Sequence, residues 1–171
     1  MKFIIPTLLA IAPPGAFSAE HIAEFPIPQA LATEHKALHD VLGRAVKEPG
    51  TLGVAARNLE EALHPHFQRE EEIALPPLAL LPKLARGESS PEMAGVLRMT
   101  DQLEKEMPQM LADHKKIVTA LEALRKTAEA AGRHEYVEFA DELALHAQNE
   151  EQVTYPAALL VGRYLKLTLK R

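Results

Sequence analysis

Two segments of the chain repeat one pattern, and this repeat limits the possible folds more than any other feature. HFQREEEIALP begins at His66, and HAQNEEQVTYP begins at His146. In both segments a glutamate stands four residues after the histidine (Glu70 and Glu150), a second glutamate follows it, and a proline ends the segment. A spacing of four residues places both side chains on one face of a helix, about one turn apart. The sequence therefore predicts two helices with equivalent faces.

A further histidine precedes each segment by a similar distance. His35 stands 31 residues before His66, and His114 stands 32 residues before His146. Each opens an apolar pattern, HKALHDVL or HKKIVTAL, and an acidic residue stands directly before it. The two halves are offset by 79 or 80 residues, which is typical of an internal structural repeat. We predict a twofold pseudo-repeat of helical hairpins.

Composition and apolar spacing both favour helices. Leu, Ala and Glu are abundant, Trp is absent, and 171 residues suit one domain with a real core. We expect a first helix from about residue 27 or 29 to residue 47, further helices over about residues 51–75 and 91–131, and a fourth from about residue 134 onward. Gly132 should end the third helix. The face of the fourth helix that points into the bundle should include Glu150 and Val153. Pro156 should bend or restart the fourth helix.

The predicted fold is all-α: an antiparallel, up-down four-helix bundle built from two pseudo-repeated helical hairpins. The bundle domain covers residues 29–171 and includes a C-terminal helical extension. Residues 1–28 form an extra N-terminal segment, which is either signal-like or a packing arm. A Pro-rich crossover, LPPLALLPKLARGESS, joins the two hairpins.

The repeated histidines and glutamates lie in register with the buried leucines of their helices, not on the polar side. Burying such groups in an apolar core costs on the order of several kcal/mol unless each is paired or metal-bound. No lysine or arginine shares these faces. Because the chain has no Cys, a transition-metal site has to use imidazole and carboxylate, which suit Fe, Zn, Mn or Cu. We therefore expect a buried dinuclear metal site.

On these motifs the chain resembles the hemerythrin family in its bacterial form, the HHE cation-binding domain. The resemblance covers about residues 30–160 and rests on H-x-x-x-E-E-x-x-x-x-P, present twice with a partner histidine upstream. It implies four antiparallel helices around a non-haem di-iron centre, oxo- or hydroxo-bridged, with an open position for O2. By the same resemblance, Glu70 and Glu150 bridge the ions. The terminal ligands are then His35, His66, His114 and His146.

The chain departs from the oxygen-carrying members of that family at one position. Those proteins have two histidines one turn apart on the third helix, whereas Val118 stands four residues after His114 here. The first helix instead carries such a pair, His35 and His39. We predict that His39 is a ligand as well, so that a six-coordinate iron pair keeps one open position. Without His39 two positions are open, which favours solvent chemistry or a different metal.

The balance of ligands indicates a binding protein more than an enzyme. Histidines outnumber carboxylates, and neutral nitrogen ligands stabilise a ferrous pair better than high-valent iron. We expect two Fe ions, with Zn or Mn as alternatives. The expected function is reversible binding or storage of O2 or another small diatomic, or the handling of iron and oxidative stress. The alternatives are an enzyme acting on peroxide or nitric oxide, a Zn-dependent hydrolase, and a structural metal bundle.

Several neighbouring residues receive a lesser role. Glu71 and Glu151 should face solvent, with a hydrogen bond to a histidine as the alternative. His64 lies two residues from the proposed ligands and should be structural or exposed. Tyr155 is placed to reach the core, but its counterpart in the first segment is Leu75, so no repeated role follows.

Charge and hydropathy argue against other partners. The net charge is −5 and the basic residues form no face of their own, so we expect no nucleic-acid partner. We also expect no membrane span, because no segment is long and apolar enough. The first residues, MKFIIPTLLAIAPPGAFSAE, resemble a short secretory signal, although Pro6 interrupts the apolar run. We favour a cytoplasmic protein, with periplasmic export as the alternative; the oligomeric state stays open.

Overall fold

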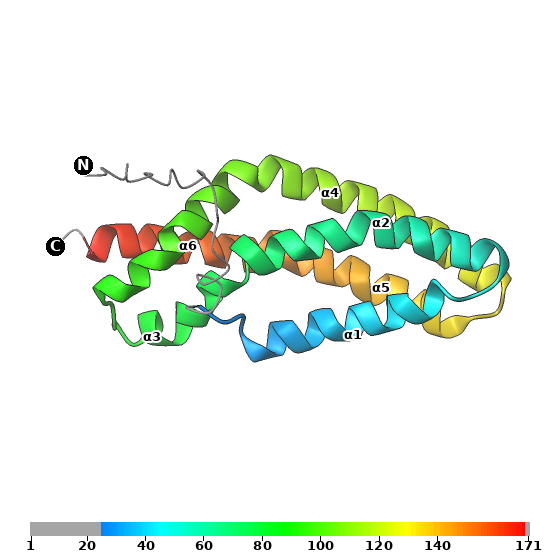
Figure 1. Cartoon of the computed structure of the whole chain (residues 1–171), viewed down its shortest axis with the longest axis horizontal. Coiled ribbons are helices and arrows are strands. Elements are labelled where there is room, and N and C mark those ends of the chain that lie inside the picture. Colours follow the sequence, from blue (N-terminus) through cyan, green and yellow to red (C-terminus); the bar gives the residue numbers. More distant parts are fainter. Residues whose placement is uncertain (1–24, 170–171) are drawn as a thin grey trace, which may run out of the picture.

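The computed structural model describes residues 25–169, a part of the chain that is helical apart from short connections and contains no strand. Four long helical segments lie along the longest axis of the molecule (Figure 1). They are α1 (Gln29–Ala45), α2 (Gly50–Ile73), α4 (Val96–Ala130) and a compound segment of α5 (His134–Asn149), η4 (Glu150–Thr154) and α6 (Tyr155–Thr168). The expected all-α helical bundle is confirmed. The signal-like stretch at the N-terminus lies outside the described residues.

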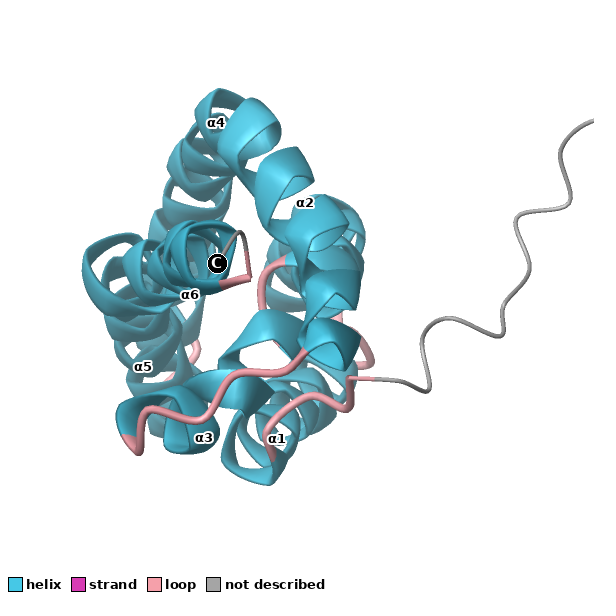
Figure 2. Cartoon of the chain, turned by 90° about the vertical axis from the view of Figure 1, so that its left-hand side faces the viewer, coloured by secondary structure: helices cyan, strands magenta, loops and turns pink. Residues whose placement is uncertain are grey.

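The connections between the helices divide between the two ends of the bundle. The turns from α1 to α2 and from α4 to α5 both lie at the right-hand end in Figure 1. At the other end the Pro-rich crossover folds into three short helices, η2 (Pro76–Leu80), α3 (Leu81–Ala85) and η3 (Pro91–Gly95). The end-on view in Figure 2 shows α1, α2, α4 and α6 arranged around a common centre.

Most helix ends lie close to the predicted positions. Gly132 follows the end of α4 with φ +65°, a conformation that glycine adopts without the steric cost of a Cβ. Pro65 and Pro108 are both accommodated inside continuous helices. The predicted start of the third helix was wrong, because Pro91 opens the 3₁₀ helix η3 and α4 begins only at Val96. Such 3₁₀ turns are frequent at the N-termini of α-helices.

A wider helical turn follows each of the repeated glutamates. In η4 the N–H of Tyr155 bonds to the carbonyl of Glu150, five residues back, as in a π-helix. The end of α2 has the same bond, from the N–H of Leu75 to the carbonyl of Glu70 at 2.9 Å. In both places the next residue is proline, which has no N–H to continue the α-helical ladder. The repeated proline thus accompanies a repeated change in helical phase.

This turn overturns the prediction that Val153 faces inward. Val153 is 58% exposed, whereas Tyr155 is 1% exposed. The prediction assumed about 100° per residue throughout, which is the rotation of a regular α-helix. The π turn contains more residues per turn, so the inward position passes from Val153 to Tyr155.

Apolar side chains pack in three clusters, and the repeated histidines lie between the first two. On α2, for example, Leu63 belongs to the first cluster and Ile73 to the second, with His66 between them. The third cluster surrounds Phe25, so the described end of the N-terminal segment packs against the bundle. Among the described residues, none of the helices combines the length and apolarity needed to cross a membrane.

Candidate metal centre

Six ionisable side chains from all four long helical segments meet in the interior of the bundle. They are His35 from α1, His66 and Glu70 from α2, His114 from α4, His146 from α5 and Glu150 from η4. All six residues are buried, and none is more than 6% exposed. Burying so many ionisable groups together is unfavourable unless they are paired or hold a metal.

These side chains form two groups of four that share both carboxylates. The first group consists of His35, Glu70, His146 and Glu150, and the second of His66, Glu70, His114 and Glu150. Within each group, one ligand atom from every residue lies within 4.8 Å of the others. The two groups are therefore adjacent, with Glu70 and Glu150 common to both.

The shared carboxylates have no lysine or arginine partner. Every basic nitrogen found within 4.0 Å of Glu70 or Glu150 in the described part of the chain belongs to a histidine. Burial, together with the charge of Glu150, raises the pKa of Glu70. Burial also opposes the ionisation of Glu150, but the surrounding histidines hold its pKa well below the ordinary value. A bound cation would favour the ionised form of both.

The histidines respond to the same two carboxylates. Burial lowers the pKa of His146, but Glu150 and Glu34 outweigh burial and raise that pKa to about 9. The pKa values of His35 and His114 are raised too, again by carboxylates acting against burial. A metal ion therefore competes with protons for these nitrogens.

The first group fits a cation because its ligand atoms have no other partner. His35 Nε2, His146 Nε2, Glu70 Oε2 and Glu150 Oε1 are all buried and make no hydrogen bond. His146 Nε2 and Glu150 Oε1 lie 2.9 Å apart, yet they are not aligned as donor and acceptor. Nitrogen and oxygen atoms that gather in one place without bonding each other are suited to coordination of an ion between them.

Tyr155, a residue not predicted from the sequence to belong to the site, contacts the second group. Its hydroxyl donates a hydrogen bond to Glu70 Oε1 at 2.5 Å. The same oxygen lies 3.3 Å from His66 Nε2 and 3.2 Å from His114 Nε2. Burial and the two glutamates raise the pKa of this hydroxyl above its ordinary value. The signal in the sequence was a tyrosine at the position where the first segment has Leu75.

Three of the histidines pair their second ring nitrogen with a glutamate at the edge of the site. The pairs are His35 Nδ1 with Glu71 at 3.4 Å, His114 Nδ1 with Glu151 at 2.9 Å, and His146 Nδ1 with Glu34 at 3.1 Å. A proton held on Nδ1 leaves Nε2 free to bind a metal and fixes the orientation of the ring. Glu71 and Glu151 therefore take the hydrogen-bonding role given above as the alternative, although 44% and 42% of their side chains stay exposed.

His66 lacks such a partner. Its Nδ1 is buried and makes no hydrogen bond. Asp113, which precedes His114 as Glu34 precedes His35, instead accepts hydrogen bonds from Gln109 and Lys116, both at 2.8 Å. An aspartate is one methylene shorter than a glutamate, which limits its reach toward a neighbouring helix. In the first group both histidines therefore have a carboxylate partner at Nδ1, whereas in the second group only His114 has one.

His39 belongs to neither group. Its half-buried ring packs edge-on against Phe67, with ring centroids 5.1 Å apart, and His35 stacks on the same Phe67 at 4.2 Å. The two histidines thus share an aromatic neighbour, and only His35 belongs to one of the two groups. Val118 is 38% exposed, and His64 is exposed as expected.

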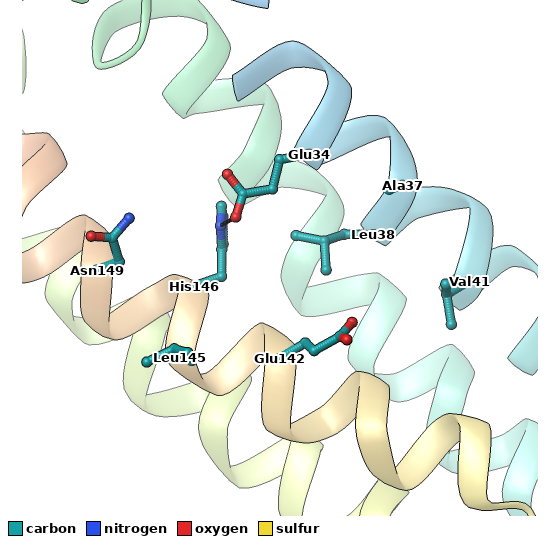
Figure 3. Close-up of a pocket in the computed structure, with 8 residues that line it drawn as sticks. All are labelled: Glu34, Ala37, Leu38, Val41, Glu142, Leu145, His146 and Asn149. Carbon is teal, nitrogen blue, oxygen red and sulfur yellow. Dashed lines mark hydrogen bonds and ion pairs between the residues drawn. The ribbon is translucent and has the colours of Figure 1, made fainter. Parts of the chain in front are cut away.

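The outer sides of the two groups differ in chemistry. Beside the first group, a pocket of about 500 Å³ opens between α1 and α5 (Figure 3). Its surface is mostly apolar, from Ala37, Leu38, Val41 and Leu145, and its polar atoms come from Glu34, Glu142, His146 and Asn149. Of the four residues of the first group, His146 lines this pocket.

Charged side chains surround the outer side of the second group. A pocket of about 410 Å³ there is lined by His66 together with charged residues of α2 and α4. Arg69 donates two hydrogen bonds to Glu106, at 2.6 and 2.7 Å, and so ties α2 to α4. An arginine–glutamate ion pair therefore lies outside the second group, whereas no lysine or arginine lines the pocket outside the first.

Comparison of the chain with protein-family models, with curated proteins and with solved structures gave no match. The chemistry of the centre is therefore inferred from its own side chains.

Proposed function

We propose that this protein holds two iron ions in a non-haem centre of the hemerythrin type and uses them to bind O2 or another small diatomic molecule. In this proposal His35 and His146 hold one ion, and His66 and His114 hold the other. Glu70 and Glu150 bridge them. The bundle would then consist of two related helical hairpins in an up-down arrangement, as the repeat in the sequence predicts.

One observation carries the proposal: two groups of buried ligand atoms share both of their carboxylates. A site for one ion needs only one such group, and a structural ion pair would place a lysine or arginine beside the glutamates. In the first group four ligand atoms have no hydrogen-bonding partner at all. A pair of cations would satisfy these atoms and neutralise both carboxylates.

The donor set favours iron in a low oxidation state. Four imidazoles and two carboxylates surround the two positions, and neutral nitrogen donors support divalent first-row metals such as Fe, Zn and Mn. When bound, a ferrous pair would supply the electrons that reversible O2 binding requires. The chain's own residues hold the ions together, orient the imidazoles through Glu34, Glu71 and Glu151, and keep bulk water out with apolar packing.

A second candidate function is turnover of peroxide or nitric oxide at the same ion pair. The observation that favours it is Tyr155, whose hydroxyl oxygen lies among the ligand atoms of the second group. An anionic oxygen donor stabilises Fe(III), as the tyrosine ligand of haem catalases illustrates. A centre held in the ferric state would release O2 less readily.

Metal analysis combined with an optical spectrum tests the proposal. The purified protein is loaded with Fe(II) without air, analysed for iron, and then exposed to O2 and to vacuum in turn. We expect two irons per chain and a visible band that appears with O2 and disappears on its removal. Irreversible oxidation would favour the second candidate function. Zinc binding without any response to O2, or no binding of two ions, would contradict the proposal.

A further inference from the structure

The hydroxyl of Tyr155 occupies a place in the second group that has no equivalent in the first. It lies within hydrogen-bonding distance of three of the four ligand residues, namely His66, Glu70 and His114. Tyr155 is 1% exposed, so no solvent competes for this oxygen. The corresponding residue of the first segment is Leu75, which carries no polar atom in its side chain.

The distances from this hydroxyl to the two histidines match those between ligands of one ion. Bonds of about 2.0–2.2 Å to a metal place adjacent ligands roughly 3 Å apart in an octahedron and slightly farther apart in a tetrahedron. The Tyr155 oxygen lies 3.3 Å from His66 Nε2 and 3.2 Å from His114 Nε2. His66 Nε2 and Glu70 Oε1 are 3.4 Å apart, and His114 Nε2 and Glu150 Oε2 are 3.3 Å apart. The hydroxyl therefore has the spacing of one more ligand atom.

We propose that Tyr155 is a ligand of the ion held by His66 and His114, binding as a phenolate through its side-chain oxygen. On binding, the O–H bond breaks, the proton leaves to solvent, and the oxygen forms a bond to the metal. The hydrogen bond to Glu70 is lost in the same step, and the Glu70 carboxylate becomes free to bridge. This inference rests on the proposed metal centre.

The backbone explains why a tyrosine reaches the site from this position. Tyr155 stands five residues after Glu150, which in a regular α-helix corresponds to a rotation of about 140° away from it. The π turn η4 adds a residue to the turn and brings Tyr155 back toward the face that carries Glu150. Turns of this kind are frequent at functional sites.

The ligand makes the two ions unequal. Tyr155 supplies to the second ion the additional ligand that the sequence analysis assigned to His39. The first ion, between His35 and His146, keeps its open coordination and lies beside the apolar pocket of Figure 3. An external small ligand therefore binds at the first ion.

A titration with Zn(II) tests the coordination directly, because zinc is colourless and ionised tyrosine has its own ultraviolet absorption. The chain has three tyrosines and no tryptophan, so this absorption is easy to resolve. We expect two zinc ions per chain and one tyrosinate. The Tyr155→Phe variant should show no tyrosinate and should bind one of its two ions at least about 10-fold more weakly.

Tyr136→Phe is the matched control. Tyr136 is also 1% exposed and also donates a hydrogen bond to a glutamate, Glu48 at 3.0 Å, but it lies near the α4–α5 turn at the other end of the bundle. This variant should keep the tyrosinate signal and should bind both zinc ions with unchanged affinity. With Fe(III), the wild type should show a visible phenolate-to-iron band that Tyr155→Phe lacks; the chain has no Cys to give a thiolate band.

The outcomes separate the two proposals. A wild-type chain that binds two ions without forming tyrosinate would overturn the role of Tyr155 and leave the dinuclear centre intact. A chain that binds no ion pair would overturn both. If Tyr155→Phe does not fold, the spectra of the wild type with Zn(II) and Fe(III) still decide the question.

Discussion

The two groups of candidate ligands share Glu70 and Glu150 but differ in almost every other contact. At the first, the ligand atoms of His35 and His146 make no hydrogen bond, and an apolar pocket lies outside. At the second, the hydroxyl of Tyr155 lies among the ligand atoms, and the Arg69–Glu106 ion pair lies outside. Equal ligands repeated in sequence therefore do not produce equal sites, because the surroundings of each site come from different helices.

This difference suggests a division of labour between the two positions. An open position beside an apolar pocket suits the entry of a small neutral molecule. A position at which Tyr155 adds a further protein ligand would suit an ion that stays in place and tunes its neighbour. The predictions that follow either remove both positions, separate them, or change the contacts by which they differ.

The largest loss of metal affinity is expected when one of the two shared carboxylates is substituted. Glu70→Gln removes a bridging ligand from both groups, so we expect affinity for both ions to fall by more than about 100-fold. Because burial raises the pKa of Glu70, the metal-free variant should be at least as stable as the metal-free wild type. Metal analysis and calorimetric melting check the two halves of this prediction.

Glu72→Gln is the control for that experiment, since Glu72 lies on the same helix, pairs with Arg69 and is 45% exposed. It should bind two ions like the wild type. Equal loss of metal from both variants would mean that Glu70 is not a ligand.

Removing single histidines should separate the two positions. His35→Ala should lose the first ion and keep the tyrosinate of Tyr155, whereas His66→Ala should lose the second ion and the tyrosinate. Each variant should retain about one ion per chain, measured by metal analysis together with ultraviolet absorption. Loss of both ions from each would show that the two positions fill only together.

His39→Ala tests the one ligand predicted from sequence that lies outside both groups. We expect it to bind two ions with unchanged affinity, because the ring of His39 contacts Phe67 and not the ligand atoms. Loss of one ion from this variant would restore the original prediction.

Substitutions of the outer carboxylates should change metal affinity less. One of them should weaken binding at the second position, and the other should strengthen it. Glu151→Gln removes the charged partner of His114 and should weaken the second ion by about 10-fold. Asp113→Glu lengthens the side chain and should allow it to reach His66 Nδ1, tightening the same ion by less than about 10-fold. Competition with a chelator measures both changes; Glu138→Gln, an exposed change on α5, should have no effect.

The smallest effect, a change in the free energy of unfolding, is expected from breaking the Arg69–Glu106 ion pair outside the second position. The hydrogen bonds from Arg69 lower the pKa of Glu106 to about 2. A lowered folded-state pKa gives stability that is present above the unfolded-state value of about 4.3 and is lost as the pH falls toward 2. We expect Glu106→Gln to destabilise the metal-free protein by about 1 kcal/mol at pH 7, and less as the pH falls through this range.

Urea denaturation at several pH values measures this difference. The control is Glu104→Gln, because Glu104 pairs with Arg163 across α4 and α6 with 53% of its side chain exposed. That variant should change stability little at any pH. An equal pH dependence for both variants would mean that the Arg69–Glu106 pair has no special contribution.

Much of the centre was predictable because its ligands come in pairs within one helix. His66 and Glu70 share a face whatever surrounds the helix, and the same is true of His146 and Glu150. The prediction for His39 used the same rule, but its position on the inner face of α1 did not bring its ring into either group. It lies one turn farther along α1, where the neighbour is Phe67.

The sequence by itself determined an all-helical chain with four buried histidines and two buried glutamates on its helix faces, because helical periodicity and the cost of burying unpaired charge act locally. Only the tertiary structure decided that Tyr155 enters the site, that three glutamates orient the histidines, and that the two positions differ. These features depend on a π turn that changes the helical phase, and on contacts such as that of Glu34 with His146, which are 112 residues apart. No local rule fixes the distance between residues on different helices; packing does.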